Sequence, residues 1–362
     1  MSILNKTKYF DSLTGVRAIA AYLVYLHHFN PVNSTLVHPV IYDFIQEFHI
    51  GVTIFFVLSG FLITYRYYES DNFNVKKYFV NRFSRIYPMY FLLTTITFIG
   101  LIISKCSLNL NDIYIYIMNI TLLRGFFDEL KFTLIAQGWT LTLEETFYIV
   151  APLIFILIKY SKNLIFILPF MFIIIGIIMV IVFRKFEFYG FFKSFGFMFG
   201  YTFFGRCFEF FAGIILALIL KAKAINFKFN YFTFSGFVLI IVSVFIMSIT
   251  KGYANFGIQT KFGFFINTII LPLFGIVPFF YGLIHEKTIF SKLLSSKIFI
   301  LLGKSSYVFY LIHLGFFHVF LRGFFNNYIF IFLLLNIISI LIYRFIENPL
   351  CVFFKNKLTL AE

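Results

Sequence analysis

The sequence predicts an all-α, polytopic integral membrane protein of about ten transmembrane helices. Of its 362 residues, 61% are hydrophobic and only 12% are charged, whereas soluble domains carry about 25% charged residues. Apolar runs recur along nearly the whole chain, such as the uncharged run 164–183. About twenty helical residues cross a hydrocarbon core of about 30 Å. Runs of this length and composition therefore indicate membrane spans.

The predicted spans place both termini on the cytoplasmic side. Ten spans are an even number, so the two ends of the chain lie on one side of the membrane. That side carries 20 of the 30 Lys and Arg residues, and an excess of basic residues marks the cytoplasmic loops. The predicted spans are 13–30, 48–66, 86–104, 142–158, 164–183, 203–220, 231–249, 264–284, 299–321 and 328–346.

The chemistry is expected to lie in one transmembrane domain, 13–347, between a short cytoplasmic N-terminus, 1–12, and a short cytoplasmic tail, 348–362. The loops 105–141 and 184–202 are long enough for small external structures but not for a catalytic domain. The net charge of +15 follows from the orienting loops, so we expect no nucleic-acid partner. The three cysteines lack metal-ligand spacing, so we expect no metal site.

Four predicted spans bring ionisable side chains to a similar depth near the outer side. Such groups are costly in a bilayer and are therefore functional candidates. They are His28, Glu144, the Arg206 and Glu209 pair, and His313. Two alternatives remain open: the imidazole of His28 caps its helix near interfacial water, and Arg206 and Glu209, one helical turn apart, form a mutual ion pair.

Arginines gather toward the cytoplasmic side. Arg17 precedes His28 by eleven residues, which returns to nearly the same helical face about 16 Å lower. Arg82 and Arg85 share a face at the start of the third span, and planar guanidinium groups suit phosphate recognition. The pattern predicts a phosphate-bearing ligand with a flexible arm, namely acyl-CoA, whose thioester reaches the outer cluster.

Such an arrangement predicts acyl transfer to a hydroxyl group. His28 would act as general base on an acceptor that approaches from outside, and Glu144 would orient the imidazole. A covalent acyl-enzyme on Ser59 or on His28 remains an alternative to direct transfer, and Ser59 also fits a small residue at a helix contact.

Three further polar residues have a structural and a functional interpretation. Tyr307 and Tyr310 are candidates to line the acceptor channel, and hydrogen bonding to neighbouring helices is the alternative for both. Glu347 is expected to pair with Arg344 or another local base, without a catalytic role.

Seven short motifs follow one another between Asp11 and Pro349. They include the Arg17 and His28 pair of the first span, the two arginines before the third and Glu144 in a Trp-to-Glu motif. The motifs occupy 13–28, 55–64, 81–88, 139–148, 206–213, 303–313 and 347–349. In this order the series resembles the family-3 membrane acyltransferases that O-acylate bacterial envelope polysaccharides.

The resemblance implies acyl-CoA, usually acetyl-CoA, as a co-substrate rather than a permanently bound cofactor, with Arg17 and His28 essential. It implies an extracytoplasmic carbohydrate acceptor of the lipopolysaccharide, exopolysaccharide or peptidoglycan type, and a multi-pass protein of the bacterial inner (cytoplasmic) membrane. Some members carry a hydrolase-like domain after the last helix, and we expect none to follow the last predicted span here. We therefore expect direct transfer or handover to a separate envelope-biosynthesis partner.

Two other function classes compete with the transferase. A secondary transporter or polysaccharide exporter would use intramembrane His, Glu and Arg as a proton or substrate route without chemistry. A sensor would bind an acylated ligand without turnover. The order of the motifs favours the transferase.

Overall fold

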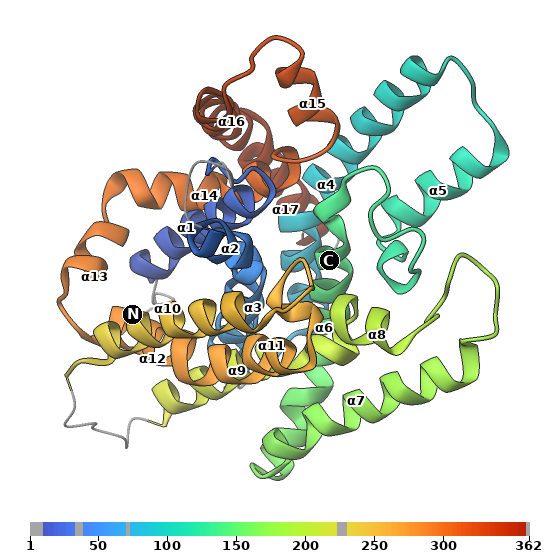
Figure 1. Cartoon of the computed structure of the whole chain (residues 1–362). Helices are drawn as coiled ribbons and strands as arrows, with labels where there is room; N and C mark the ends of the chain where they lie inside the picture. Colours follow the sequence, from blue (N-terminus) through green and yellow to red (C-terminus); the bar gives the residue numbers. More distant parts are fainter. Residues whose placement is uncertain (1–9, 33–38, 70–72, 223–229, 360–362) are drawn as a thin grey trace.

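The computed structural model describes residues 10–32, 39–69, 73–222 and 230–359, and these residues fold into packed helices (Figure 1). Within these ranges no β-strand is formed, and the one isolated bridge joins Phe127 to Phe191. The α-helices are α1 (Asp11–His28), α2 (Pro39–Gln46), α3 (Ile50–Tyr67), α4 (Val75–Lys105), α5 (Leu110–Ile120), α6 (Trp139–Tyr160), α7 (Leu164–Phe183), α8 (Phe195–Tyr201), α9 (Phe203–Lys221), α10 (Phe232–Thr250), α11 (Lys261–Phe265), α12 (Val277–His285), α13 (Ile289–Leu294), α14 (Lys297–Ile312), α15 (Phe316–Arg322), α16 (Tyr328–Ile342) and α17 (Asn348–Thr359).

The predicted fold class is confirmed. Eight helices in the described part of the chain are long and apolar enough to cross a membrane, or nine if the bent pair α14 and α15 counts as one span. Helix α1 occupies the first predicted span but is not among them. It carries Asp11, Arg17, His27 and His28, which lower its hydropathy. Its position in the bundle explains how so polar a helix is tolerated.

Helix α1 lies near the middle of the molecule together with α3 (Figure 1). It packs against α3, α13 and α14, and the contacts are close enough to require glycine. A β-carbon on Gly51 of α3 would lie 2.2 Å from the carbonyl oxygen of Ala20, and one on Gly303 of α14 would lie 1.8 Å from that of Thr14. Small residues allow helices in a membrane to approach backbone to backbone. The polar residues of α1 are therefore held inside the bundle.

The ninth predicted span, 299–321, is not a single straight helix, which corrects the expectation. Helices α14 and α15 meet at an angle of 86°. Gly315 at the bend has a φ of +78°, a conformation that glycine adopts without strain. The amide Nε2 of Gln137 donates to the carbonyl oxygens of Tyr310 and Leu311, at 2.7 and 2.8 Å. It thereby satisfies carbonyl groups that the end of α14 leaves without helical partners.

The predicted C-terminal tail, 348–362, is also mostly helical. A π-helical turn, Tyr343–Glu347, links α16 directly to α17, and α17 packs along α4. Residues 360–362 of the tail and 1–9 of the predicted N-terminal segment lie outside the described residues. The two long loops pair with each other: the backbone N–H groups of Asp128 and Glu129 donate to the carbonyl oxygens of Gly190 and Tyr189, at 3.1 and 3.2 Å.

A bulky residue in the α3–α9 contact is expected to destabilise the bundle. A β-carbon on Gly213 would lie 2.1 Å from the carbonyl oxygen of Val57, so Gly213→Val must push the two helices apart. Overpacking typically costs about 1–3 kcal/mol. The melting temperature of the purified protein in detergent should fall. Gly200→Ala is the control, because nothing lies within 4 Å of a β-carbon there. Equal melting temperatures for both variants would contradict the close contact.

Candidate active site

A large cavity of about 940 Å³ opens beside the C-terminal end of α1. Its wall is contributed by α1, the turn between α2 and α3, α3, α6 and the segment before it, α8, α9, α14, and α11 with the segment before it. Most of the wall is apolar and much of it is aromatic. The aromatic residues that line it are Phe132, Trp139, Phe195, Phe199, Tyr201, Phe256, Phe264 and Tyr310.

Imidazole groups gather at this cavity. His28 lines it, and its ring centre lies 4.9 Å from that of His27 and 5.7 Å from that of His313. The prediction that His28 and His313 lie at one level is therefore confirmed. Nδ1 of His27 lies 2.5 Å from the carbonyl oxygen of Gln46, and Nδ1 of His313 lies 2.8 Å from that of Tyr310. A carbonyl oxygen only accepts, so each neutral ring carries its proton on Nδ1 and a lone pair on Nε2.

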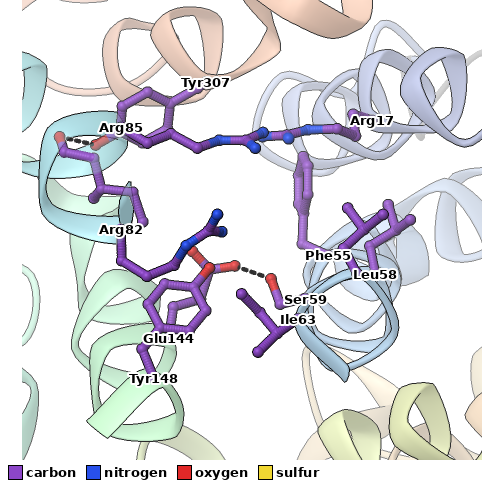
Figure 2. Close-up of a pocket in the computed structure, with 12 residues that line it drawn as sticks. Arg17, Phe55, Leu58, Ser59, Ile63, Arg82, Arg85, Glu144, Tyr148 and Tyr307 are labelled. Carbon is purple, nitrogen blue, oxygen red and sulfur yellow. Dashed lines mark hydrogen bonds between the residues drawn. The ribbon is translucent and has the colours of Figure 1, made fainter. Parts of the chain in front are cut away.

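A second, narrow cavity of about 50 Å³ contains the three predicted arginines. Arg17 reaches it from α1, and Arg82 and Arg85 reach it from α4 (Figure 2). Ser59, Tyr148 and Tyr307 also line it. The guanidinium group of Arg82 is stacked over the rings of Tyr67 and Tyr148, at 5.9 and 5.8 Å from their centres.

None of these three arginines makes an ion pair within 4 Å among the residues that the structure describes. Nε of Arg17 and Nε of Arg82 are buried without a hydrogen-bond partner. Buried charges are stable only when they are paired. The cluster is therefore suited to an anionic ligand.

Glu144 lies in the arginine cavity and not beside His28, which corrects the expected depth. Its carboxylate accepts a hydrogen bond from the hydroxyl of Ser59 (Figure 2). Its charged neighbours are Arg17, Arg85 and Arg82, whereas those of His28 are the other histidines. Glu144, the sixth residue of α6, therefore shares a cavity with Arg17 in the first half of α1 rather than with His28 at its end.

Glu347 also belongs to the arginine cluster. We expected it to pair with Arg344 or another local base. No ion pair joins it to Arg344 within the described residues, and Arg344 is exposed. The charged groups that act on the Glu347 carboxylate are Arg85 and Arg17. The π-helical turn before α17 shifts the helical register at this point, and sequence periodicity does not reveal such a shift.

A third cavity of about 40 Å³ lies between the other two. It shares Arg17 and Glu144 with the arginine cavity, and Val52 and Tyr310 with the large one. The three cavities therefore form a series from the arginines to the imidazoles. Tyr307 borders the two narrow cavities, and its hydroxyl also donates to the carbonyl oxygen of Ile86 at 2.9 Å. It therefore both lines a cavity and bonds to a neighbouring helix.

Tyr310 likewise combines both interpretations, because it lines the large cavity and its hydroxyl lies 3.1 Å from that of Thr140. Gln137, which the sequence analysis missed, lies in the same wall. Its only signal in the sequence is its place two residues before Trp139. His49 was also missed; it lines the large cavity from the turn before α3.

The predicted ion pair between Arg206 and Glu209 is confirmed. Nε and Nη2 of Arg206 donate to the two carboxylate oxygens at 2.7 and 2.6 Å, and both side chains are buried. Glu209 also accepts from the hydroxyl of Thr53 at 2.8 Å. Asn267, in the π-helical segment Ile266–Ile276, lies within 3.1 Å of that hydroxyl. Arg206 lines the large cavity, so this network supports one wall of it.

Removal of Arg206 is expected to destabilise the protein. In Arg206→Ala the carboxylate of Glu209 stays buried without its cation, and loss of one partner of a buried pair typically costs about 3–5 kcal/mol. The double variant Arg206→Met, Glu209→Leu removes both charges and should recover much of the loss. Thermal unfolding in detergent measures both. A single variant as stable as the unchanged protein would show that the pair is dispensable.

Comparison with known proteins agrees with this arrangement. The family model described as "Acyltransferase domain" matches residues 10–345. A "Putative O-acetyltransferase" of Staphylococcus aureus (strain COL) is 26% identical over 380 residues, covering 95% of this chain and 58% of the relative. The O-acetyltransferase OatA of Staphylococcus aureus (strain NCTC 8325 / PS 47) is 26% identical over 378 residues, covering 95% and 57%.

The chain thus spans a little more than half the length of these relatives. No solved structure matches it. The family match covers every helix from α1 to α16 and all the residues of the three cavities. The protein therefore belongs to the family of membrane acyltransferases that its sequence motifs resemble.

Proposed function

We propose that the protein is a membrane O-acetyltransferase that moves an acetyl group from acetyl-CoA to a hydroxyl group of an extracytoplasmic carbohydrate. The observation that carries the proposal is the series of three cavities, with unpaired arginines at one end and imidazoles at the other. Coenzyme A combines phosphates, a flexible arm and a thioester, and this order matches the series. The names of the staphylococcal relatives support O-acetyl transfer.

In this proposal the arginine cavity holds the donor. Arg17, Arg82 and Arg85 bind phosphate oxygens, which guanidinium groups recognise in a bidentate manner. The carboxylates of Glu144 and Glu347 compensate part of the positive charge of the three arginines. Each narrow cavity has only the volume of a few water molecules. The pantetheine arm of the donor must therefore separate α1 from α4 and α6 as it passes. Glu144 then positions Arg17 instead of the distant imidazole.

The large cavity holds the acceptor. His28 takes the proton of the attacking hydroxyl, a bond forms between that oxygen and the acyl carbon, and the carbon–sulfur bond breaks. The proton passes from His28 to the leaving thiolate, so the products are the O-acetyl ester and free coenzyme A. Direct transfer is preferred over an acyl-Ser59 intermediate, because Ser59 lies among the proposed phosphate ligands and its hydroxyl is bound to Glu144.

The family supports the proposed setting. We infer a bacterial inner membrane, with lipopolysaccharide, exopolysaccharide or peptidoglycan as acceptor type, and with a separate envelope-biosynthesis partner where handover is needed.

Purified protein given radiolabelled acetyl-CoA should release coenzyme A and label the acceptor. Release of no coenzyme A, together with proton-gradient-dependent flux of the sugar, would favour the transporter instead.

Loss of the His28 imidazole should abolish transfer without unfolding the protein. General-base catalysis contributes about 10²–10⁴-fold to a rate, so His28→Ala should reduce the turnover number by at least that range. The melting temperature and the affinity for acetyl-CoA should remain near those of the unchanged protein. His285→Ala, which removes an exposed imidazole far along the chain on α12, is the matched control. A His28→Ala protein with normal turnover would exclude the assigned base.

Loss of the arginines should weaken donor binding. Each hydrogen bond to a charged group contributes about 1.5–3 kcal/mol, and about 1.4 kcal/mol corresponds to tenfold in affinity. Arg82→Gln with Arg85→Gln should therefore raise the Kd for acetyl-CoA at least tenfold in isothermal titration. Lys76→Gln with Lys77→Gln is the control, because these exposed residues begin the same helix. Unchanged affinity in the arginine variant would contradict the phosphate assignment.

A further inference from the structure

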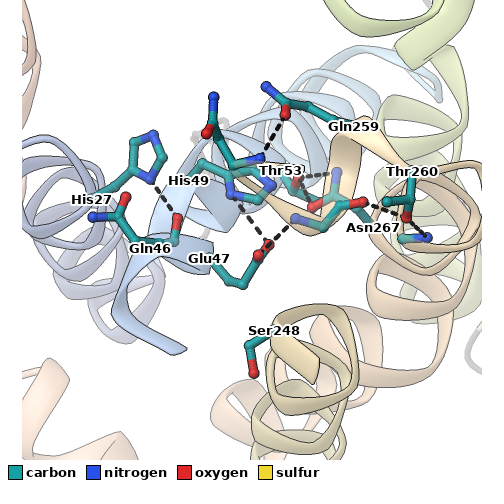
Figure 3. Close-up of polar contacts among 12 residues, drawn as sticks. His27, Gln46, Glu47, His49, Thr53, Ser248, Gln259, Thr260 and Asn267 are labelled. Atoms are coloured by element: carbon teal, nitrogen blue, oxygen red, sulfur yellow. Dashed lines mark hydrogen bonds and ion pairs between the residues drawn. The ribbon is translucent and has the colours of Figure 1, made fainter. Parts of the chain in front are cut away.

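The turn between α2 and α3, Glu47–His49, forms part of the wall of the large cavity, and its polar groups are not needed by the reaction described above (Figure 3). His49 lines the cavity, and its ring centre lies 5.6 Å from that of His27, which in turn lies 4.9 Å from that of His28. Three imidazoles therefore succeed one another along this wall.

Neither ring nitrogen of His49 has a hydrogen-bond partner among the described residues, although 86% of the side chain is shielded by its neighbours. The amide oxygen of Gln137, in the same cavity wall, is also buried and without a partner. Buried polar atoms without partners are costly and rare in folded proteins. Two of them at one cavity indicate that a bound molecule supplies the missing partners.

Glu47 orients His49. Its carboxylate is fully buried and accepts a hydrogen bond from the N–H of Gly257 at 2.7 Å. The other carboxylate oxygen lies 3.7 Å from Nδ1 of His49 (Figure 3), which is within ion-pair reach but longer than a hydrogen bond. A carboxylate at this position favours a proton on Nδ1 and a lone pair on Nε2.

Two cations on neighbouring elements are already paired, while Lys261 also lines the cavity. Lys251 binds Asp43 at 2.7 Å, and Arg206 is paired with Glu209. The described lining of the cavity contains no Asp or Glu. A hydroxyl group that enters the cavity therefore finds no carboxylate, and its hydrogen-bond acceptors there are imidazole nitrogens, amide or carbonyl oxygens and the hydroxyl oxygens of Tyr201, Thr260 and Tyr310.

We propose that His49, positioned by Glu47, and the amide oxygen of Gln137 bind hydroxyl groups of the acceptor that neighbour the one presented to His28. The cavity then selects a sugar with several hydroxyl groups over a simple alcohol. Apolar faces of the sugar lie against the aromatic wall. This inference rests on the proposed function and adds the groups that recognise the acceptor.

The test measures acceptor binding and donor binding separately in the same purified protein. The probe is envelope polysaccharide of the cells that carry the gene, stripped of its esters by mild base, with radiolabelled acetyl-CoA as donor. His49→Asn should raise KM for the polysaccharide by about tenfold, the loss expected for a hydrogen bond to a buried group. The Kd for acetyl-CoA and the melting temperature should stay unchanged.

Glu47→Gln separates orientation from folding, because the glutamine oxygen still accepts from the N–H of Gly257. It should raise the acceptor KM in the same direction as His49→Asn and by a smaller factor. His285→Asn is the control for the loss of an imidazole outside the cavity and should change none of these values.

Four outcomes decide the matter. A higher acceptor KM with normal donor affinity supports the inference. An unchanged acceptor KM in His49→Asn overturns it. A fall in melting temperature together with a loss of donor affinity assigns His49 a structural role and also overturns it. If the protein without substitutions labels no polysaccharide and releases no coenzyme A, the proposed function is overturned, and the acceptor assignment with it.

Discussion

The close packing of α1 against α3 and α14 is the constraint on which the rest of the structure depends. Lipid is as apolar as the helices, so association in a membrane relies on intimate contact and on polar groups that find partners. The glycines at these contacts let backbones touch. A helix with an arginine and two histidines can then remain in the centre of the bundle, and its length sets the spacing between the arginine cluster and the imidazoles.

The polar residues within the bundle fall into two physically different groups. Arg206 and Glu209 satisfy each other and are completed by Thr53 and Asn267, so their role is to hold helices together. Arg17, Arg82 and Arg85 share a cavity without an ion-pair partner in the described chain. These three guanidinium groups outnumber the two nearby carboxylates, Glu144 and Glu347, and Nε of Arg17 and of Arg82 lacks a partner. The second group is therefore the one that points to an anionic ligand.

The positions of the spans were predictable from sequence because hydropathy and length are properties of each segment by itself. Segment 164–183 became helix α7 with the predicted bounds. The bend between α14 and α15 was not predictable, since it depends on a glycine together with an amide group of Gln137 from a distant segment. The π-helical turn that carries Glu347 is a similar case: it changes which way a side chain faces without any change in composition.

The sequence by itself determined the membrane fold class, the family, and the residue types available for chemistry, including Arg17 and His28 on one helix. The shared level of His28 and His313 was also predicted from the sequence. Only the tertiary structure decided that Glu144 joins the arginines and that His49 and Gln137 border the same cavity as His28. The physical reason is that apolarity adds up along a chain. The depth of a side chain in the membrane and the direction in which it points depend, in contrast, on how helices tilt and cross. Contacts between residues far apart in sequence set this tilt and crossing.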